Sequence, residues 1–388
     1  MTASASGPTR VLPGGTLGVF GGGQLGRMLG LAARNMGYRF AVLSDDADGP
    51  AAQVADQVAV AAYDDEEAVA EFARSVDAVS FEFENVPSVA GEVASRWTAV
   101  RPDVGLLHAV QDRTREKRAL ERLGLPLPAF RAIASEDDLA EAARAIPGAG
   151  VLKTSSFGYD GKGQVRVESA EGLGAAWASI GRVPAVLEAL VPFVDEISVV
   201  VARGVDGDLA VYEPFSNAHA NHILDVTVCP ADLDEDSLAE AHRIARAVAE
   251  GFDVVGVLCI EMFRLEDGTI LVNEIAPRPH NSGHLTIDAH ACSQFEQQAR
   301  AVAGLPLGSS ARIGPPAAMA NLLGDLWADG TPRWDAALAL PGVSLHLYGK
   351  KEARPGRKMG HLTAVAATPA EAAALARRAR AALTAPPA

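Results

Sequence analysis

Two glutamates near the middle of the chain could bind a divalent metal ion. Glu261 and Glu274 lie in apolar runs that flank Asp267-Gly268, a strong signal for a two-residue hairpin turn. Counting outward from that turn puts the two carboxylates opposite each other on one face, with Cβ atoms roughly 5 Å apart. Facing carboxylates repel, and a hard cation such as Mg²⁺, or Mn²⁺ in its place, offsets that cost. Asn273 adds an oxygen ligand if a bulge turns it inward; the alternatives are a solvated outer face or a longer turn that shifts the register.

A glycine-rich segment follows a short apolar strand that ends at Lys153. It reads Gly158-Tyr159-Asp160-Gly161-Lys162-Gly163-Gln164 and precedes a second apolar run. Such a loop can close its backbone amides over phosphate groups, while the lysines add compact positive charge. The alternative is an ordinary surface hairpin with solvated lysines.

The segment 275–284, directly after the second glutamate, combines arginine, histidine, asparagine and serine with prolines and a glycine. This composition suits a loop that binds an anionic substrate. His280 and His284 have the i,i+4 spacing of a helical zinc pair, but the intervening proline and glycine argue against a helix. We therefore expect anion-binding or hydrogen-bonded loop histidines.

A glycine motif near the N-terminus matches G-x-G-x-x-G. The string Gly21-Gly22-Gly23-Gln24-Leu25-Gly26 follows an apolar run and precedes a helical pattern, which directs backbone amides toward an anion. Asp45 and Asp46 stand about twenty positions on, where a nicotinamide oxidoreductase carries its ribose-binding carboxylate. Other phosphates, or close packing alone, can also require such a turn.

Two further clusters carry charge suited to a ligand. Glu82 and Glu84 end the fourth predicted strand, where open α/β sheets bind ligands; the alternative is a carboxylate pair in water. A basic cluster in this acidic chain indicates a monophosphate site, with a solvated charge run as the alternative. Its members are Lys350, Lys351, Arg354, Arg357 and Lys358.

Apolar periodicity divides the chain into regions that would position these groups. Alternating strands and helices up to residue 112 predict a parallel sheet, 113–188 is typical of a small α+β module, and neighbouring strands after 189 predict an antiparallel sheet. We expect a helix capped by Ser135 and a terminal helix opened by a capping box at Thr368. The expected strands are 17–20, 39–43, 58–60, 79–81, 151–153, 164–167, 185–190, 197–203, 209–215, 257–263 and 270–275.

Composition excludes some classes of function. The chain has 388 residues and a net charge of -15, which argues against nucleic-acid binding because a phosphate backbone needs a basic face. The 3 cysteines form no CxxC pair, so we expect buried free thiols rather than disulfides or structural zinc. No run approaches the roughly 20 apolar residues of a membrane span. A cytoplasmic enzyme with a disordered tail over 1–15 is expected.

Together these motifs resemble the ATP-grasp enzymes, and among them the N5-carboxyaminoimidazole ribonucleotide synthetases, ATP-dependent carboxylating enzymes of purine biosynthesis. The string at 273–284 is specific to this family and its purine-pathway relatives, whereas the first glycine motif is not. The resemblance implies a Rossmann-like pre-ATP-grasp domain (16–112), a lid (113–188) and a larger antiparallel-sheet domain (189–388) with a terminal subdomain (319–388). The matching strings are 21–28, 81–87, 152–154, 158–164, 273–284 and 357–361.

The resemblance also implies a reaction, in which ATP phosphorylates bicarbonate and the activated carbon passes to aminoimidazole ribonucleotide. It implies Mg²⁺ at Glu261 and Glu274, a homodimer, and no nucleic-acid or membrane partner. ATP would contact Arg113, Lys153, Gly158, Tyr159, Asp160, Gly161, Lys162, Gly163, Gln164, Glu188, Ala189, Leu190, Val191, Glu196, His219, Asn273 and Glu274. The ribonucleotide would contact Gln24, Leu25, Glu82, Lys350, Arg357 and Lys358, and catalysis would fall to Tyr159, Asp160, Arg278, His280 and Asn281.

One departure from the family pattern concerns the lid. Ser155-Ser156-Phe157 stands where relatives usually have an arginine after the Lys-Thr pair, which puts a lid cation in question. Three alternative functions remain open: another ATP-grasp ligase such as the formate-dependent glycinamide ribonucleotide transformylase, a nicotinamide oxidoreductase, and a nucleotide sensor without catalysis.

Overall fold

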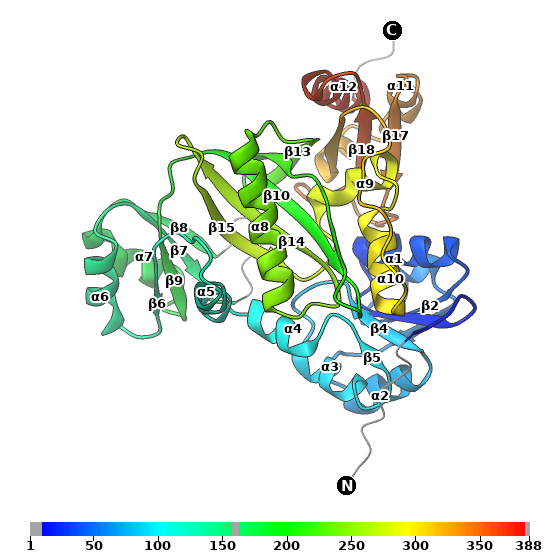
Figure 1. Ribbon diagram of the computed structural model, residues 1–388, viewed down its shortest axis with the longest axis horizontal. Coiled ribbons are helices and arrows are strands. Elements are labelled where there is room, and N and C mark those ends of the chain that lie inside the picture. Colours follow the sequence, from blue (N-terminus) through cyan, green and yellow to red (C-terminus); the bar gives the residue numbers. More distant parts are fainter. Residues whose placement is uncertain (1–9, 157–162, 385–388) are drawn as a thin grey trace.

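Three β-sheets organise the residues that the computed structural model describes, which are 10–156 and 163–384. In Figure 1 they follow one another along the chain, from the sheet around β4 through the small sheet around β7 to the large sheet that carries β10 and β14. Among the described residues, no helix has both the length and the apolar character needed to cross a bilayer.

The first sheet has five parallel strands in the order β3-β2-β1-β4-β5. Strand β1 is buried at every position, as expected for a parallel strand with helices on both faces. The predicted parallel sheet is confirmed, and the carboxyl ends of β1 and β4 border the site described below. The elements are β1 (Thr16–Phe20), α1 (Gln24–Asn35), β2 (Arg39–Ser44), η1 (Ala52–Val54), β3 (Gln57–Val60), α2 (Glu66–Arg74), β4 (Ala78–Phe81), α3 (Ser88–Ala94), β5 (Ala99–Val100) and α4 (Val104–Val110).

The second sheet is small and antiparallel, with the order β6-β9-β7-β8. Leu152 and Leu187 on its strands pack against Leu173 and Trp177 of α7, which closes a separate core. Helix α5 leads into this sheet from the first one. The elements are α5 (Arg113–Arg122), β6 (Phe130–Ile133), α6 (Asp138–Ala145), β7 (Gly150–Thr154), β8 (Gln164–Val167), η2 (Ala170–Gly172), α7 (Leu173–Ser179) and β9 (Ala185–Ala189).

The third sheet is antiparallel and runs β15-β14-β10-β12-β13-β16-β18-β17, with β11 paired to β10. Ile244 and Val248 of α8 pack on Ile260 of β14, while Val302 of α10 reaches the core of the first sheet. The elements are β10 (Phe193–Arg203), β11 (Leu209–Val211), β12 (Phe215–Ala220), β13 (Ile223–Cys229), α8 (Glu235–Gly251), β14 (Gly256–Leu265), β15 (Ile270–Ala276), η3 (Asn281–Leu285), α9 (Thr286–Ala289), α10 (Gln294–Ala303), β16 (Ala317–Leu323), η4 (Gly324–Trp327), α11 (Trp334–Leu338), β17 (Val343–Leu347), β18 (Lys358–Val365) and α12 (Pro369–Ala382).

Three local expectations are wrong. Ser135 does not cap α6, because the helix begins at Asp138, whose carboxylate accepts the N–H of Ser135 at 2.8 Å. The single strand expected over 209–215 is two strands, β11 and β12, in different pairings with β10. The expected disordered tail does not reach residue 15, since Val11 is buried and donates its N–H to Ala303 at 2.7 Å. The capping box at Thr368 is confirmed.

Candidate active site

One cleft of about 1170 Å³ lies where the three sheets meet. It is bordered by the carboxyl ends of β1 and β4, by strands β7 to β9, and by the face of the large sheet around β14 and β15. The predicted Gly158, Tyr159, Asp160, Gly161 and Lys162 fall outside the described residues. Every other predicted site residue lines this cleft: Gln24, Leu25, Glu82, Arg113, Lys153, Gly163, Gln164, Glu188, Ala189, Leu190, Val191, Glu196, His219, Glu261, Asn273, Glu274, Arg278, His280, Asn281, Lys350, Arg357 and Lys358.

The two glutamates pair as predicted. Glu261 on β14 lies directly opposite Glu274 on β15, so the two side chains share one face of the sheet. The turn between the strands is one residue longer than expected, because Leu265 pairs with Thr269 and Gly268 adopts φ +85. A bulge at Asn273 shifts the register back by one residue and restores the predicted pairing.

Positive groups surround the acid pair. Arg113 Nη1 lies 2.9 Å from Glu274 Oε2, and His280 Nε2 lies 2.8 Å from Glu261 Oε1. Burial opposes the charge of Glu274, but Arg113 and Lys153 outweigh it and hold the pKa of Glu274 at about 2. At neutral pH this carboxylate is therefore ionised and able to accept a cation.

A lysine network lies behind the acid pair. Lys117 and Lys153 each place Nζ 3.2 Å from the same oxygen of Glu188, Oε2. Lys117 also donates to the Asn273 carbonyl at 2.7 Å, and Lys153 donates to the Asn273 side-chain oxygen at 3.3 Å. Among the described residues, the other oxygen of Glu188 has no hydrogen-bond partner, and it is buried.

Sequence reasoning missed Lys117 and the neighbouring Glu116, which accepts the N–H of Ile275 at 2.7 Å. Burial raises the pKa of Glu116 to about 7. The i,i+4 spacing of Arg113 and Lys117 on α5 was the available signal, because such residues share one face of a helix.

Glu82 occupies the helix N-terminus created by the glycine motif. Its carboxylate accepts the N–H of Gly23 at 2.5 Å and that of Leu25 at 3.1 Å. Gly21 has φ +126, and a Cβ at Gly21 or Gly23 would lie within 2.6 Å of the Glu82 side chain. The glycines are thus explained by the approach of Glu82, and the amides that a dinucleotide phosphate would need are already bound.

Other predicted residues form ion pairs at the cleft wall. Arg278 binds Glu84 through both Nε and Nη2, the latter at 3.0 Å, in a bidentate pair. His219 pairs with Glu196 across β12 and β10, and although burial opposes its protonation, the bond to Glu196 raises the pKa of His219.

The basic cluster lies in the loop between β17 and β18 (348–357, the basic loop) and at Lys358, the first residue of β18. Lys350 donates to the Lys358 carbonyl at 2.7 Å, and Arg357 donates to the Glu352 carbonyl at 2.9 Å. Lys350, Arg354, Arg357 and Lys358 line the cleft. Lys351, in contrast, is exposed and pairs with Asp48 at 2.7 Å.

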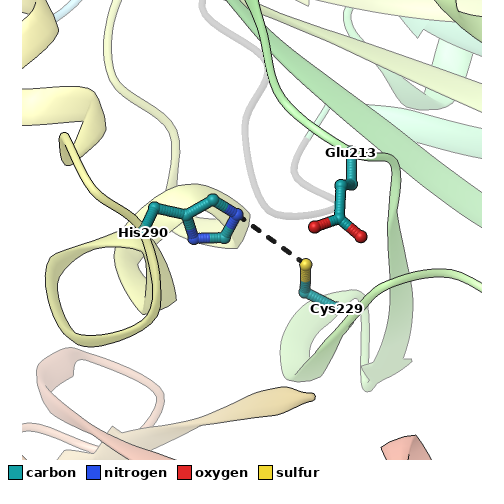
Figure 2. A group of neighbouring side chains, drawn as sticks. All are labelled: Glu213, Cys229 and His290. Carbon is teal, nitrogen blue, oxygen red and sulfur yellow. Dashed lines mark hydrogen bonds between the residues drawn. The ribbon is translucent and has the colours of Figure 1, made fainter. Parts of the chain in front are cut away.

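A second group of possible metal ligands lies elsewhere. Figure 2 shows Glu213, Cys229 and His290 pointing toward one another, with Cys229 Sγ 4.0 Å from His290 Nε2. Arg312 already neutralises Glu213 at 3.1 Å, and burial raises the pKa of the Cys229 thiol far above its usual range. Glu213 is paired with Arg312, and Cys229 and His290 contact each other, so we interpret this group as packing. The described cysteines are free and buried, as predicted.

A small antiparallel sheet and a larger one that enclose a lysine-lined cleft with facing glutamates define an ATP-dependent ligase of the ATP-grasp class. Family models support this class across the chain. The ATP-grasp domain matches residues 118–295, the ribonucleotide synthetase preATP-grasp domain matches 15–111, and the phosphoribosylaminoimidazole carboxylase C-terminal domain matches 317–375.

Similar individual proteins indicate which family within the ATP-grasp class the chain belongs to. The N5-carboxyaminoimidazole ribonucleotide synthase of Brucella melitensis is 45% identical over 359 residues, covering 92% of this chain and 98% of that protein. A crystal structure of an N5-carboxyaminoimidazole ribonucleotide synthetase with ADP has 40% identity and a TM-score of 0.89, covering 96% of this chain and 98% of that one. The enzyme from Aspergillus clavatus, in complex with ADP and 5-aminoimidazole ribonucleotide, has 31% identity and a TM-score of 0.86, covering 95% and 98%. The chain belongs to the N5-carboxyaminoimidazole ribonucleotide synthase family.

Proposed function

We propose that this chain carboxylates aminoimidazole ribonucleotide with bicarbonate and ATP in purine biosynthesis. The products are N5-carboxyaminoimidazole ribonucleotide, ADP and phosphate. The observation that carries the proposal is the single cleft that holds the facing pair Glu261 and Glu274, the cations Lys153 and Arg113, and the basic loop 348–357. Nucleotide phosphates and a ribonucleotide phosphate can therefore be bound beside each other.

The metal cofactor in this proposal is Mg²⁺. Glu261, Glu274 and the Asn273 side chain offer hard oxygen donors on adjacent strand positions, which fits this ion. When bound, such an ion neutralises charge on the ATP phosphates. The present partners of the two carboxylates, Arg113 and His280, are hydrogen-bond donors that also suit phosphate and bicarbonate oxygens.

In the first step, a bicarbonate oxygen attacks the γ-phosphorus of ATP. The bond from that phosphorus to the β–γ bridging oxygen breaks, which yields carboxyphosphate and ADP. Lys153 and Arg113 offset the charge that develops on the transferred group, the usual source of catalysis in phosphoryl transfer.

In the second step, the exocyclic amine of the ribonucleotide attacks the carboxyl carbon. The carbon–oxygen bond to phosphate breaks, phosphate leaves with the electron pair, and it takes up the proton that the nitrogen loses. Lys350, Arg357 and Lys358 bind the ribonucleotide phosphate, which holds the amine near Arg278 and His280.

The adenine end of ATP lies against β9 and the residues that follow it. The N–H groups of Ala189 and Leu190 already bind the carbonyls of Ala129 and Ala149, at 2.8 and 2.9 Å. Val191 is therefore the residue that donates its N–H to the adenine ring. The Glu188 oxygen that has no partner among the described residues accepts from the adenine amino group or a ribose hydroxyl.

An assay of ADP release tests this proposal. We expect release to require bicarbonate and to rise when aminoimidazole ribonucleotide is added; no stimulation by that nucleotide would reject the substrate assignment. Replacing bicarbonate and the ribonucleotide with formate and glycinamide ribonucleotide should give no turnover. Activity with that second pair would identify the transformylase alternative instead.

The assembly and compartment are part of the same proposal. We infer a homodimer in the cytoplasm, with small-molecule substrates as its partners. Light scattering coupled to gel filtration should give twice the mass of the 40.3 kDa chain. A mass of one chain at micromolar concentration would contradict the dimer.

A further inference from the structure

A buried network of hydrogen-bonded polar side chains, called the polar network below, connects η3 to the basic loop. Its members come from β16, η3, the residue after β17, and β18, which are far apart in the sequence. None is more than 9% exposed. They are Asn321, Asn281, His284, Tyr348 and His361.

The donor and acceptor of each hydrogen bond in the polar network can be assigned by starting from one backbone carbonyl. Asn321 Nδ2 lies 2.7 Å from the Leu224 carbonyl, which can only accept, so the amide orientation of Asn321 is fixed. Asn321 Nδ2 then donates to Asn281 Oδ1 at 2.8 Å, and Asn281 Nδ2 donates back to Asn321 Oδ1 at 3.1 Å. The orientation of Asn281 follows from that of Asn321.

The same logic continues through the histidines. Asn281 Nδ2 also lies 3.2 Å from His284 Nδ1, so this nitrogen accepts and the His284 proton is on Nε2, a buried atom with no acceptor among the described residues. The Tyr348 hydroxyl, 3.0 Å from His284 Nδ1, must therefore donate to it as well, so two donors share the single lone pair of this nitrogen. That leaves the Tyr348 oxygen to accept from His361 Nδ1, at 2.9 Å. Burial lowers the pKa of both histidines well below the usual range, which agrees with two neutral rings.

The polar network changes the role expected for Asn281. Both hydrogens of its amide are bound, one by Asn321 Oδ1 and one by His284 Nδ1. The amide therefore has no hydrogen left to donate to a substrate. Its contribution to the cleft is its remaining oxygen lone pair and the fixed position of η3.

Tyr348 is the member of the polar network that contacts residues on the ribonucleotide side of the cleft. Its ring packs on Leu25 at the start of α1. The ammonium of Lys350 lies 5.8 Å from the centre of the ring, within reach of a cation–π interaction. The N–H of Tyr348 donates to the Met359 carbonyl at 3.0 Å, which joins the two ends of the basic loop.

We propose that Tyr348 is a positioning residue for the ribonucleotide, whose hydroxyl holds η3 and the basic loop in the relative arrangement that binds this substrate. The inference rests on the proposed function. Without the hydroxyl, His284 loses a donor and His361 loses its acceptor, so η3 is joined to β18 only indirectly, through the Asn281–Asn321 pair and β16. Affinity for the ribonucleotide then falls, while the ATP side of the cleft is unaffected.

Steady-state kinetics of Tyr348→Phe test the proposal. We expect the KM for aminoimidazole ribonucleotide to rise about ten-fold, consistent with the loss of a buried hydrogen bond, with kcat and the KM for ATP changed less than about three-fold. Tyr212→Phe is the matched control, because Tyr212 is 0% exposed and its hydroxyl donates to the Cys292 carbonyl at 2.7 Å. It should leave all three constants unchanged. A variant at Tyr348 that behaves like the control overturns the proposal.

A spectroscopic measurement separates this inference from the proposed function. In ¹⁵N-histidine-labelled protein, His284 should show the Nε2–H tautomer and His361 the Nδ1–H tautomer, with the His361 signals shifted in Tyr348→Phe. The opposite tautomers would overturn the inference, whatever the substrate is.

A second position provides rescue. Asparagine at position 361 can still donate near the Nδ1 position, so His361→Asn should keep the ribonucleotide KM closer to wild type than His361→Leu does. Equal effects of the two variants overturn the proposal. Wild-type protein without ribonucleotide-dependent turnover would instead reject the proposed function, and the positioning role with it.

Discussion

Lys117 provides a test of whether the acid pair depends on the charge network behind it. Its side chain is 0% exposed, and Nζ lies 3.2 Å from Glu188 and donates to the Asn273 carbonyl at 2.7 Å. Methionine is unbranched, apolar and of similar length. The substitution Lys117→Met therefore removes the charge with little change in packing.

The loss of two interactions determines how far the free energy of unfolding should fall. The buried Glu188 loses one of its two lysines, and the Asn273 carbonyl loses its donor. Each partly unsatisfied group costs about 1–3 kcal/mol, and relief from burying the ammonium offsets part of the sum. We expect a net loss of about 3 kcal/mol, which corresponds to a fall of roughly 6–12 °C in melting temperature for a unit of 150–250 residues.

The same change should weaken metal binding, because the Asn273 carbonyl holds the bulge that turns Glu274 toward Glu261. We expect the Mg²⁺ concentration for half-maximal ADP release to rise about ten-fold. Lys351→Met is the control, since that lysine pairs with Asp48 on the exposed surface and should change neither quantity.

Differential scanning calorimetry and a Mg²⁺ titration measure the two effects. A Lys117→Met protein that melts within about 1 °C of wild type would refute the stability argument. An unchanged Mg²⁺ requirement would refute the link between the bulge and the acid pair.

Three further outcomes are expected. Glu274→Gln should lower turnover at least about a hundred-fold in the ADP-release assay without lowering the melting temperature by more than a few degrees, whereas Glu266→Gln on the loop of the same hairpin should retain activity. Burial lowers the pKa of His290 to about 4, so on acidification the unfolded chain binds this proton first. The free energy of unfolding should therefore fall by about 3 kcal/mol as the pH drops from about 6.5 to 4. In urea titrations, His290→Phe should lack this part of the fall, whereas His108→Gln, at an exposed histidine, should retain it. Cys229 should react with a thiol reagent only after denaturant is added, and rapid reaction in native protein would contradict its buried, protonated state.

The sequence predicts the site best where chemistry and local periodicity coincide. Turn chemistry at Asp267-Gly268 and alternation along two strands are local signals, and they place Glu261 opposite Glu274 correctly. Two differences from the prediction cancel: the loop is one residue longer than predicted, and the extra residue at the Asn273 bulge shifts the register back by one. Bulges carry no reliable local signal, so the pairing could be predicted but its cause could not.

The sequence predicts poorly what depends on contacts between distant elements. Lys117 and Glu188 are 71 positions apart. The i,i+4 spacing on α5 places Lys117 on the same helix face as Arg113, but it does not indicate that this lysine meets a carboxylate on β9. The same holds for the polar network that includes Asn321 and His361, whose members come from separate elements. Polar residues at such positions look solvated until the fold shows that they are buried and paired.

The glycine motif shows why a local pattern fixes a geometry without fixing a ligand. A strand, a glycine turn and a helix present free amides to some anion, and the sequence alone favours a nucleotide phosphate. Here the anion is Glu82, supplied from the end of β4, where neighbouring strand ends of a parallel sheet meet. The glycines are needed because a Cβ at Gly23 would come within 2.2 Å of that carboxylate. A motif of this kind identifies a nucleotide site only when no side chain of the same sheet reaches its amides first.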